Sequence, residues 1–338
     1  MAAPEGLYRY DFEKPVAELD RRLREVRKAG DADKQTATIR ALEGQLEQLK
    51  RKVYGGLSAW QRVQLARHPL RPYTLDYIRL IMGEFLELHG DRLYGDDKAL
   101  IGGITHLAGR ACLVLGHQKG RDTKENLMRN FGSAHPEGYR KALRLMQLAQ
   151  KYRLPIVVFI DTPGAYPGVG AEERGQAHSI ASNLREMSRI RTPIWICVIG
   201  EGGSGGALGI GIGDWVAMLD NAYYSVISPE GCAAILWRDR AKAPEAAEAL
   251  KLTAKDFHGL GLVDEILSEP LGGAHHDQEM VAQRMKEAIL RFWKTADSLS
   301  LDELLRRRYD RFRRMGIYTA QLSSTVLSAS PLEPALSA

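Results

Sequence analysis

The segment GEGGSGGALGIGIG, at residues 200–213, is unusually rich in glycine and follows an apolar run. Glycine permits unusual backbone dihedral angles and lets a ligand approach the main chain closely. Backbone N–H groups in the first turn of a helix have no intrahelical acceptor, so they can bind an anion or an oxygen that gains negative charge. The segment is therefore a candidate site for such an oxygen.

Two nucleotide-binding motifs fit this segment poorly. A P-loop requires a lysine after its glycines, and none follows here, which excludes that motif. Residues 200–205 match the dinucleotide fingerprint in length, but they lie late in the chain and lack a suitable acidic residue further on. An oxyanion hole made of backbone N–H groups, a nucleophilic Ser204, and close helix–strand packing without a ligand stay open as alternatives.

A second candidate loop has the same position relative to its strand. The run at 155–161 is apolar up to its final Asp161, as in strands buried on both faces, and DTPGAYPG at 161–168 follows it. The run at 193–199 leads in the same way into the glycine segment. Ligands in α/β folds bind beyond the carboxyl ends of parallel strands, so we expect the two loops to lie together.

The surrounding sequence predicts the elements that hold these loops. Apolar runs at 101–106 and 111–115 predict paired strands around a turn. A helix entered through 136–138 and another over 172–189 alternate with the buried strands, and further short strands are expected at 215–219 and 223–227. Strand, glycine-rich turn and helix in alternation indicate an α/β architecture.

The N-terminal part has a different pattern. Residues 13–53 are charged and carry two apolar stripes on either side of a break at 29–33. This predicts an antiparallel helical hairpin, which either covers the main domain or contacts a partner. The opposite end, from residue 323, is small, polar and proline-containing, and we expect it to be disordered.

The composition restricts the class of protein. The content of 44% hydrophobic and 26% charged residues is ordinary for a globular protein with a full core. The net charge of +5 favours an anionic ligand such as a coenzyme over a nucleic acid. No apolar run approaches the roughly 18 residues of a membrane helix. Three widely spaced cysteines predict buried thiols and no metal site, so we expect a cytoplasmic protein.

Longer motifs resemble a known family. They closely match the carboxyltransferase α subunit of bacterial-type acetyl-CoA carboxylase, from about residue 12 to about residue 316. The motifs are RHPLRPYTLDYI at 67–78, GHQKGR at 116–121, PEGYRKALRLM at 136–146, FIDTPGAYPGVGAEERGQ at 159–176, VIGEGGSGGAL at 198–208, YSVISPEGCAAILW at 224–237 and EPLGGAH at 269–275.

The resemblance implies a fold and an activity. The fold would be an α/β crotonase/ClpP-like core of repeated ββα units at 56–316, preceded by the hairpin at 1–55 and followed by a tail at 317–338. The activity would be carboxyl transfer from carboxybiotin, held on a separate biotin carboxyl carrier protein, to acetyl-CoA, forming malonyl-CoA for fatty acid biosynthesis. ATP would serve only the partner biotin carboxylase, and this chain would hold no metal.

The resemblance also implies roles for residues and partners. Backbone N–H groups of Gly205 and Gly206 would stabilise the ureido oxyanion of biotin, with Gly164 and Ala165 as companions in the second loop. A zinc-ribbon-containing β subunit, most simply in an α2β2 assembly, would complete the active site. Substrate-binding residues would be Gly203, Ser204, Tyr166, Lys119 and Arg121; Lys119 and Arg121 follow a strand and either meet coenzyme A phosphate or are solvated.

Two alternatives and one expected substitution follow. A crotonase-like hydratase acting alone would need a carboxylate over its substrate, and Asp161 and Glu201 are the candidates. A non-catalytic scaffold would use the basic hairpin to bind protein or RNA. We expect Gly206→Val to leave the fold intact and to block the biotin ring, and we expect His68, His117 and His275 to be structural.

Overall fold

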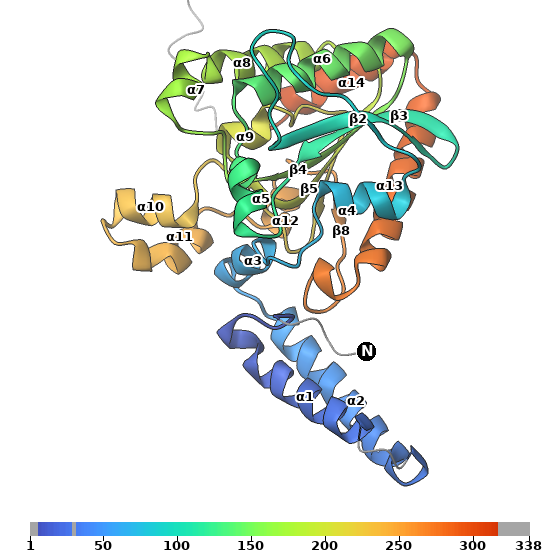
Figure 1. Cartoon of the computed structure of the whole chain (residues 1–338), viewed down its shortest axis with the longest axis vertical. Coiled ribbons are helices and arrows are strands. Elements are labelled where there is room, and N and C mark those ends of the chain that lie inside the picture. The colour runs from blue at the N-terminus through green and yellow to red at the C-terminus, as the bar shows by residue number, and fades with distance from the viewer. Residues whose placement is uncertain (1–5, 29–31, 317–338) are drawn as a thin grey trace, which may run out of the picture.

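The computed structural model describes residues 6–28 and 32–316, as an α/β body and a helical hairpin that extends away from it (Figure 1). The hairpin consists of α1 (Lys14–Lys28) and α2 (Ala32–Gly55). Its facing stripes bury Val16, Leu23 and Leu42, which confirms the predicted hairpin. The second helix already begins within the predicted break at 29–33, and the tail at 317–338 lies outside the described residues.

The body is built on one eight-stranded sheet in the order β1-β2-β3-β4-β5-β6-β8, with β7 paired to the end of β5. The first three strands are antiparallel and the rest are parallel. The strands are β1 (Leu86–Glu87), β2 (Leu100–Leu107), β3 (Arg110–His117), β4 (Ile156–Thr162), β5 (Ile194–Gly203), β6 (Trp215–Leu219), β7 (Tyr223–Ser225) and β8 (Glu265–Leu267). Every residue of β4 and β5 is buried, which confirms the two predicted core strands.

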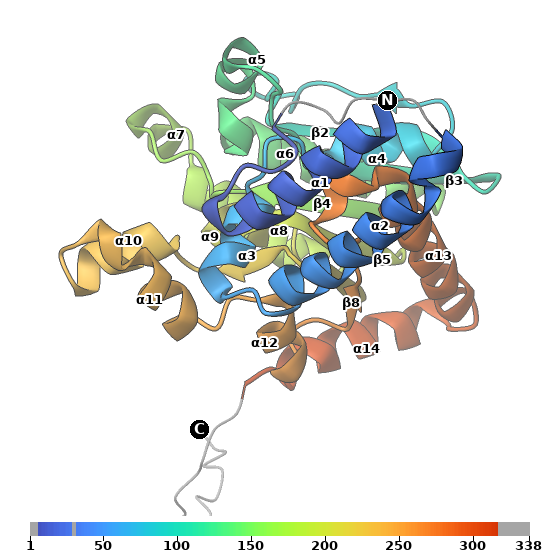
Figure 2. The ribbon, with the colours of Figure 1, turned by 90° about the horizontal axis from the view of Figure 1, so that it is seen from below.

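Helices cover this sheet and extend beyond it. Both α6 and α4 contact β3, α8 packs on α6, and α13 packs on α4, while α10 and α11 form a lobe to one side (Figures 1 and 2). The helices are α3 (Ala59–Ala66), α4 (Thr74–Ile81), α5 (Thr123–Met128), α6 (Pro136–Tyr152), α7 (Val169–Glu173), α8 (Gln176–Met187), α9 (Ser204–Leu208), α10 (Pro229–Leu236), α11 (Ala243–Ala249), α12 (Ala254–Gly259), α13 (Gln278–Asp297) and α14 (Leu301–Arg313), with 3₁₀ turns η1 (Asp11–Glu13), η2 (Asn130–Gly132), η3 (Arg240–Lys242) and η4 (Ala274–His276).

One predicted helix is divided. Instead of one helix over 172–189, the chain forms α7 and α8, separated at Gly175. Gly175 has φ of 81°, a left-handed conformation that interrupts helical hydrogen bonding and that glycine adopts without strain. Because the helix is divided, α7 can follow the 161–168 loop in a different direction from α8, which packs along α6.

Buried polar groups join the parts of the molecule. Arg71 and Glu269 form an ion pair with fully buried side chains, and the Arg71 Nε also donates to the carbonyl oxygen of Ile199 in β5 at 2.6 Å. All three cysteines are buried and free, as predicted. None of the helices in the described part of the chain is long and apolar enough to cross a membrane.

Histidines fill the joint between the hairpin and the body. The rings of His68 and His275 stack with their centroids 3.8 Å apart, and His276 contacts His275 and Tyr54 of α2. Burial lowers the pKa of His68 and of His276 to about 4, and that of His275 to about 2. These rings are therefore neutral in the folded protein at neutral pH.

This joint predicts acid-dependent stability. Histidines in an unfolded chain have a pKa of about 6.5, so below that pH the unfolded state binds more protons than the folded state. We expect the free energy of unfolding to be unaffected by these rings above about pH 6.5 and to fall as the pH decreases towards 4. His275→Phe keeps the stacked ring and removes one titrating group. Its melting temperature should fall less steeply with acid in circular dichroism, and identical slopes for both proteins would contradict the prediction.

Candidate active site

The first half of the glycine segment is strand, not loop. The predicted strand at 193–199 continues to Gly203, because residues 201–203 pair with β7 and Gly202 lies opposite Thr162 of β4. Only at Ser204 does the chain turn into the short helix α9. The segment therefore contributes the end of a central strand and the first turn of a helix.

Two glycines at this point allow backbone segments to touch. A Cβ on Gly203 would lie 2.2 Å from the carbonyl oxygen of Pro163, and one on Gly206 would lie 2.5 Å from the carbonyl carbon of Gly164. The packing interpretation is thus correct for these two positions. It also corrects the expectation for Gly206→Val: the side chain would collide with the backbone of the second loop, so the fold would not stay intact.

Gly205 is different because it faces open space. A Cβ at Gly205 would meet only the Cδ1 atom of Ile180, at 3.4 Å. Gly205 lies on a cavity of about 430 Å³, within the range of small-molecule sites. Both predicted loops line this cavity, together with α7, α8 and the segment that enters α10: Pro163, Gly164, Ala165, Tyr166, Pro167, Glu172, Gln176, Ala177, Ile180, Ser204, Gly205, Val226, Ile227 and Ser228.

The backbone on the cavity wall has unusual conformations. Ser204 has φ of 47° and Gly164 has φ of 154°. A left-handed serine at the junction of a strand and a helix costs conformational energy, as is common at functional sites. The N–H of Gly164 donates to Thr162 Oγ1 at 3.1 Å, so it is already engaged. Residues 204–206 form the first turn of α9, where N–H groups have no acceptor one turn earlier.

The structure thus brings together five of the predicted residues. Gly164, Ala165, Tyr166, Ser204 and Gly205 line one cavity, whereas Gly203 and Gly206 lie behind its wall against the second loop.

Lys119 and Arg121 lie elsewhere and already have partners. Arg121 donates to the main chain at Pro69 and Arg71 and pairs with Asp76. Lys119 is largely buried between two carboxylates and is not solvated. Their contact with coenzyme A stays a prediction.

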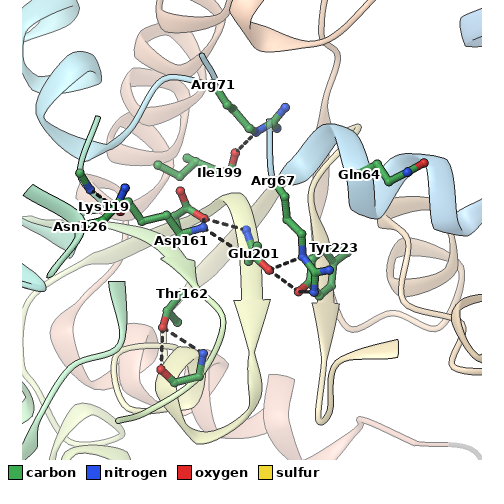
Figure 3. A network of polar contacts seen from close by, with 12 residues as sticks. Gln64, Arg67, Arg71, Lys119, Asn126, Asp161, Thr162, Ile199, Glu201 and Tyr223 are labelled. Carbon is green, nitrogen blue, oxygen red and sulfur yellow. Dashed lines mark hydrogen bonds and ion pairs between the residues drawn. The ribbon is translucent and has the colours of Figure 1, made fainter. Parts of the chain in front are cut away.

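A buried polar network lies beneath the two loops (Figure 3). Lys119 Nζ is 2.7 Å from Asp161 Oδ1 and 2.8 Å from Glu201 Oε1. The other Glu201 oxygen accepts from Arg67 Nε at 2.7 Å and from the Tyr223 hydroxyl at 2.6 Å. Burial alone would raise the pKa of Glu201, but Lys119 and Arg67 hold it at about 2. Glu201 is therefore ionised, and both carboxylates are committed to partners within the chain.

Sequence reasoning missed the cationic and phenolic part of this network. Arg67 begins the motif at 67–78, from which no role was predicted for it, and Tyr223 begins the predicted strand at 223–227. Arg67 also pairs with Glu230 of α10, on the other side of the network from Lys119. One feature of the sequence did point to a cation here. Asp161 ends one apolar run and Glu201 follows the next, and two carboxylates at the ends of neighbouring buried strands need a charged partner between them.

Comparisons with known proteins identify the family of this chain. A family model described as acetyl co-enzyme A carboxylase carboxyltransferase-like matches residues 9–316. The acetyl-coenzyme A carboxylase carboxyl transferase subunit alpha of Geobacter metallireducens is 54% identical over 309 residues, covering 91% of this chain and 97% of that protein. That of Xanthomonas axonopodis pv. citri is 56% identical over 310 residues, with the same coverage. This chain belongs to the acetyl-CoA carboxylase carboxyltransferase family.

The family assignment agrees with the fold. The transcarboxylase 12S crystal structure, determined with methylmalonyl-coenzyme A and methylmalonic acid bound, superposes with a TM-score of 0.55 at 19% identity. It covers 68% of this chain, which spans 42% of the transcarboxylase chain. At this identity the match shows a shared crotonase-like carboxyltransferase fold and nothing about ligands. Among the described residues, no group of three or more histidine, cysteine, aspartate or glutamate side chains could hold a metal ion.

Proposed function

We propose that this carboxyltransferase subunit of acetyl-CoA carboxylase binds biotin during carboxyl transfer. The cavity between its two loops would hold the ureido group of biotin. Carboxybiotin, carried on a separate protein, would supply the carboxyl group, and acetyl-CoA would accept it to give malonyl-CoA. The observation that carries this proposal is Gly205: its first-turn N–H and its open space lie on a cavity that both loops line.

The cavity suits a neutral ring system with one oxygen that gains charge. Ala165, Ile180 and Val226 give it apolar walls, and the ends of the two loops supply backbone groups. Preorganised N–H donors act strongly on an oxyanion in such a site, and loss of one donor typically costs roughly 3–4 kcal/mol. Gly205 would donate directly, while Gly206, behind the cavity wall, would hold α9 against the second loop.

The polar network argues against a hydratase that acts alone. That alternative needs a carboxylate free to reach the substrate, and the candidates were Asp161 and Glu201. Both side chains are buried, and Lys119 bridges them. Glu201, which Lys119 and Arg67 hold ionised, is a poor proton acceptor because its pKa lies far below neutral pH.

The partners follow from the family. A zinc-ribbon-containing β subunit would bring the acetyl-CoA site, in an α2β2 assembly in the cytoplasm, and the biotin carboxyl carrier protein would deliver the carboxyl group. ATP would be used only by the separate biotin carboxylase. The acyl-CoA specificity would lie mainly in the β subunit.

Reconstitution tests the proposed function. The chain alone should form no malonyl-CoA from acetyl-CoA and carboxylated carrier, and adding the β subunit should start the reaction. Chromatographic detection of malonyl-CoA gives the readout, and enoyl-CoA hydration is measured in parallel. Hydration by the isolated chain, or no malonyl-CoA from the purified complex, would overturn the proposal.

A further inference from the structure

Lys119 occupies a singular position between the two strands that carry the cavity loops. Its stem packs beneath η2, where a Cβ on Gly132 would lie 2.9 Å from Lys119 Cγ. Its ammonium group then contacts Asp161, one residue before the end of β4, and Glu201, near the end of β5 (Figure 3). The side chains of Asp161 and Glu201 are 1% and 8% exposed, so water screens these contacts little.

The contacts lie where the two strands change register. Regular pairing of β4 with β5 ends at Ile160 and resumes with a shift at Thr162. At this shift Asp161 Oδ1 also accepts the backbone N–H of Glu201 at 2.9 Å, and the Asp161 carboxylate fills the space above Gly200. Beyond this point the loops continue in contact, through Gly203 with Pro163 and Gly206 with Gly164. The register shift therefore sets how Gly205 faces the second loop.

We propose that Lys119 is a positioning residue for carboxyl transfer: by bridging Asp161 and Glu201 it fixes the relative position of the two loops that line the cavity. The inference rests on the proposed function, since it assigns a role to the same cavity. It is an alternative to the coenzyme A contact expected from sequence, because here the ammonium group already contacts two buried carboxylates.

The charges around Lys119 predict what its removal does. Without the ammonium group, Asp161 and Glu201 would repel each other at the register shift, with only Arg67 and the Tyr223 hydroxyl still on Glu201. The other titratable groups that interact with the two carboxylates or with Lys119 are Tyr10, Arg71, Tyr73, Tyr77 and His117. The tyrosines and the histidine are uncharged at neutral pH, and Arg71 is already paired with Glu269, so none of them replaces the lost cation. Protonating one carboxyl group, or replacing one by an amide, should relieve the repulsion.

The test uses the complex of this chain with its β subunit. We expect Lys119→Met to lower kcat for malonyl-CoA formation on the order of 100-fold, as for a misplaced reacting group, with KM for acetyl-CoA within about threefold of wild type. Activity of this variant should rise relative to wild type as the pH falls. The double variant K119M/E201Q should have a kcat at least about tenfold higher than Lys119→Met, and its activity should depend less on pH. Lys124→Met removes an exposed lysine nearby and should behave as wild type.

Several results would overturn the proposal. They are an increased KM for acetyl-CoA with kcat unchanged, wild-type activity in Lys119→Met, or no recovery at low pH or in the double variant. If Lys119→Met does not fold, the double variant K119M/E201Q decides alone. A folded double variant whose kcat is still on the order of 100-fold below wild type contradicts the positioning role of Lys119. Hydrogen exchange of residues 199–206 tests the bridge without activity, and should be faster in Lys119→Met. The two proposals can also fail separately. If the wild-type complex forms no malonyl-CoA but its residues 199–206 exchange more slowly than those of Lys119→Met, the proposed function is refuted and the bridging role of Lys119 is retained.

Discussion

Replacing Gly205 by valine is expected to lower malonyl-CoA formation on the order of 100-fold in a chain that stays folded. The branched side chain would enter the cavity next to Ile180, where a glycine Cβ position meets nothing else within 4 Å. Gly205 lies inside α9 with a negative φ, so a side chain adds no backbone strain. The loss should therefore come from the filled cavity and the shielded N–H group.

Two variants separate this effect from a general loss of structure. Ile180→Ala combined with Gly205→Val restores room in the cavity wall and should regain part of the activity. Gly206→Val should instead lower the melting temperature, because its Cβ would lie 2.5 Å from the carbonyl carbon of Gly164. Calorimetry and the coupled malonyl-CoA assay measure both properties. Full activity of folded Gly205→Val would remove Gly205 from the biotin site.

Replacing Arg71 by methionine should destabilise the body by about 3–5 kcal/mol, as expected when one partner of a buried ion pair is removed. Arg71 and Glu269 are both fully buried, and Arg71 also holds the carbonyl oxygen of Ile199 just before the glycine segment. Glu269 would remain as an uncompensated buried charge, with Asn221 and the N–H of Ala274 as its remaining donors.

Denaturant titration of three variants checks this prediction. Arg71→Met should show a much lower unfolding midpoint, whereas R71M/E269M should recover much of the loss because no buried charge remains. Arg191 pairs with Asp302 on the surface, so Arg191→Met should change the free energy of unfolding by no more than about 1 kcal/mol. Equal effects of Arg71→Met and Arg191→Met would show that the buried pair contributes nothing special.

The parallel strands were predictable because of their composition. The runs at 155–161 and 193–199 are apolar at successive positions, and only a strand covered on both faces buries such a run. The hairpin was predictable for a related reason, since its stripes repeat every three to four residues. The break at Gly175 was not predicted, because a glycine inside a helical segment is often tolerated and its left-handed φ is seen only in the structure.

The candidate site was predicted only in part. The two loops and their meeting point followed from where the strands end, and Gly164, Ala165 and Gly205 do lie on one cavity. Which glycine serves packing and which faces open space depends on contacts between segments far apart in the chain. Gly205 and Gly206 are adjacent and chemically identical, yet only Gly206 lies against the second loop.

The sequence by itself determined the family, the two core strands at 155–161 and 193–199, and the glycine segment as half of a candidate site. These depend on local composition and on motifs that are read along the chain. Tertiary structure alone decided that Lys119 faces Asp161 and Glu201, and that Arg67 and Tyr223 complete their shell. The physical reason is that an ion pair is set by distance in space and by burial, and residues 67, 119, 161, 201 and 223 meet only when the sheet assembles.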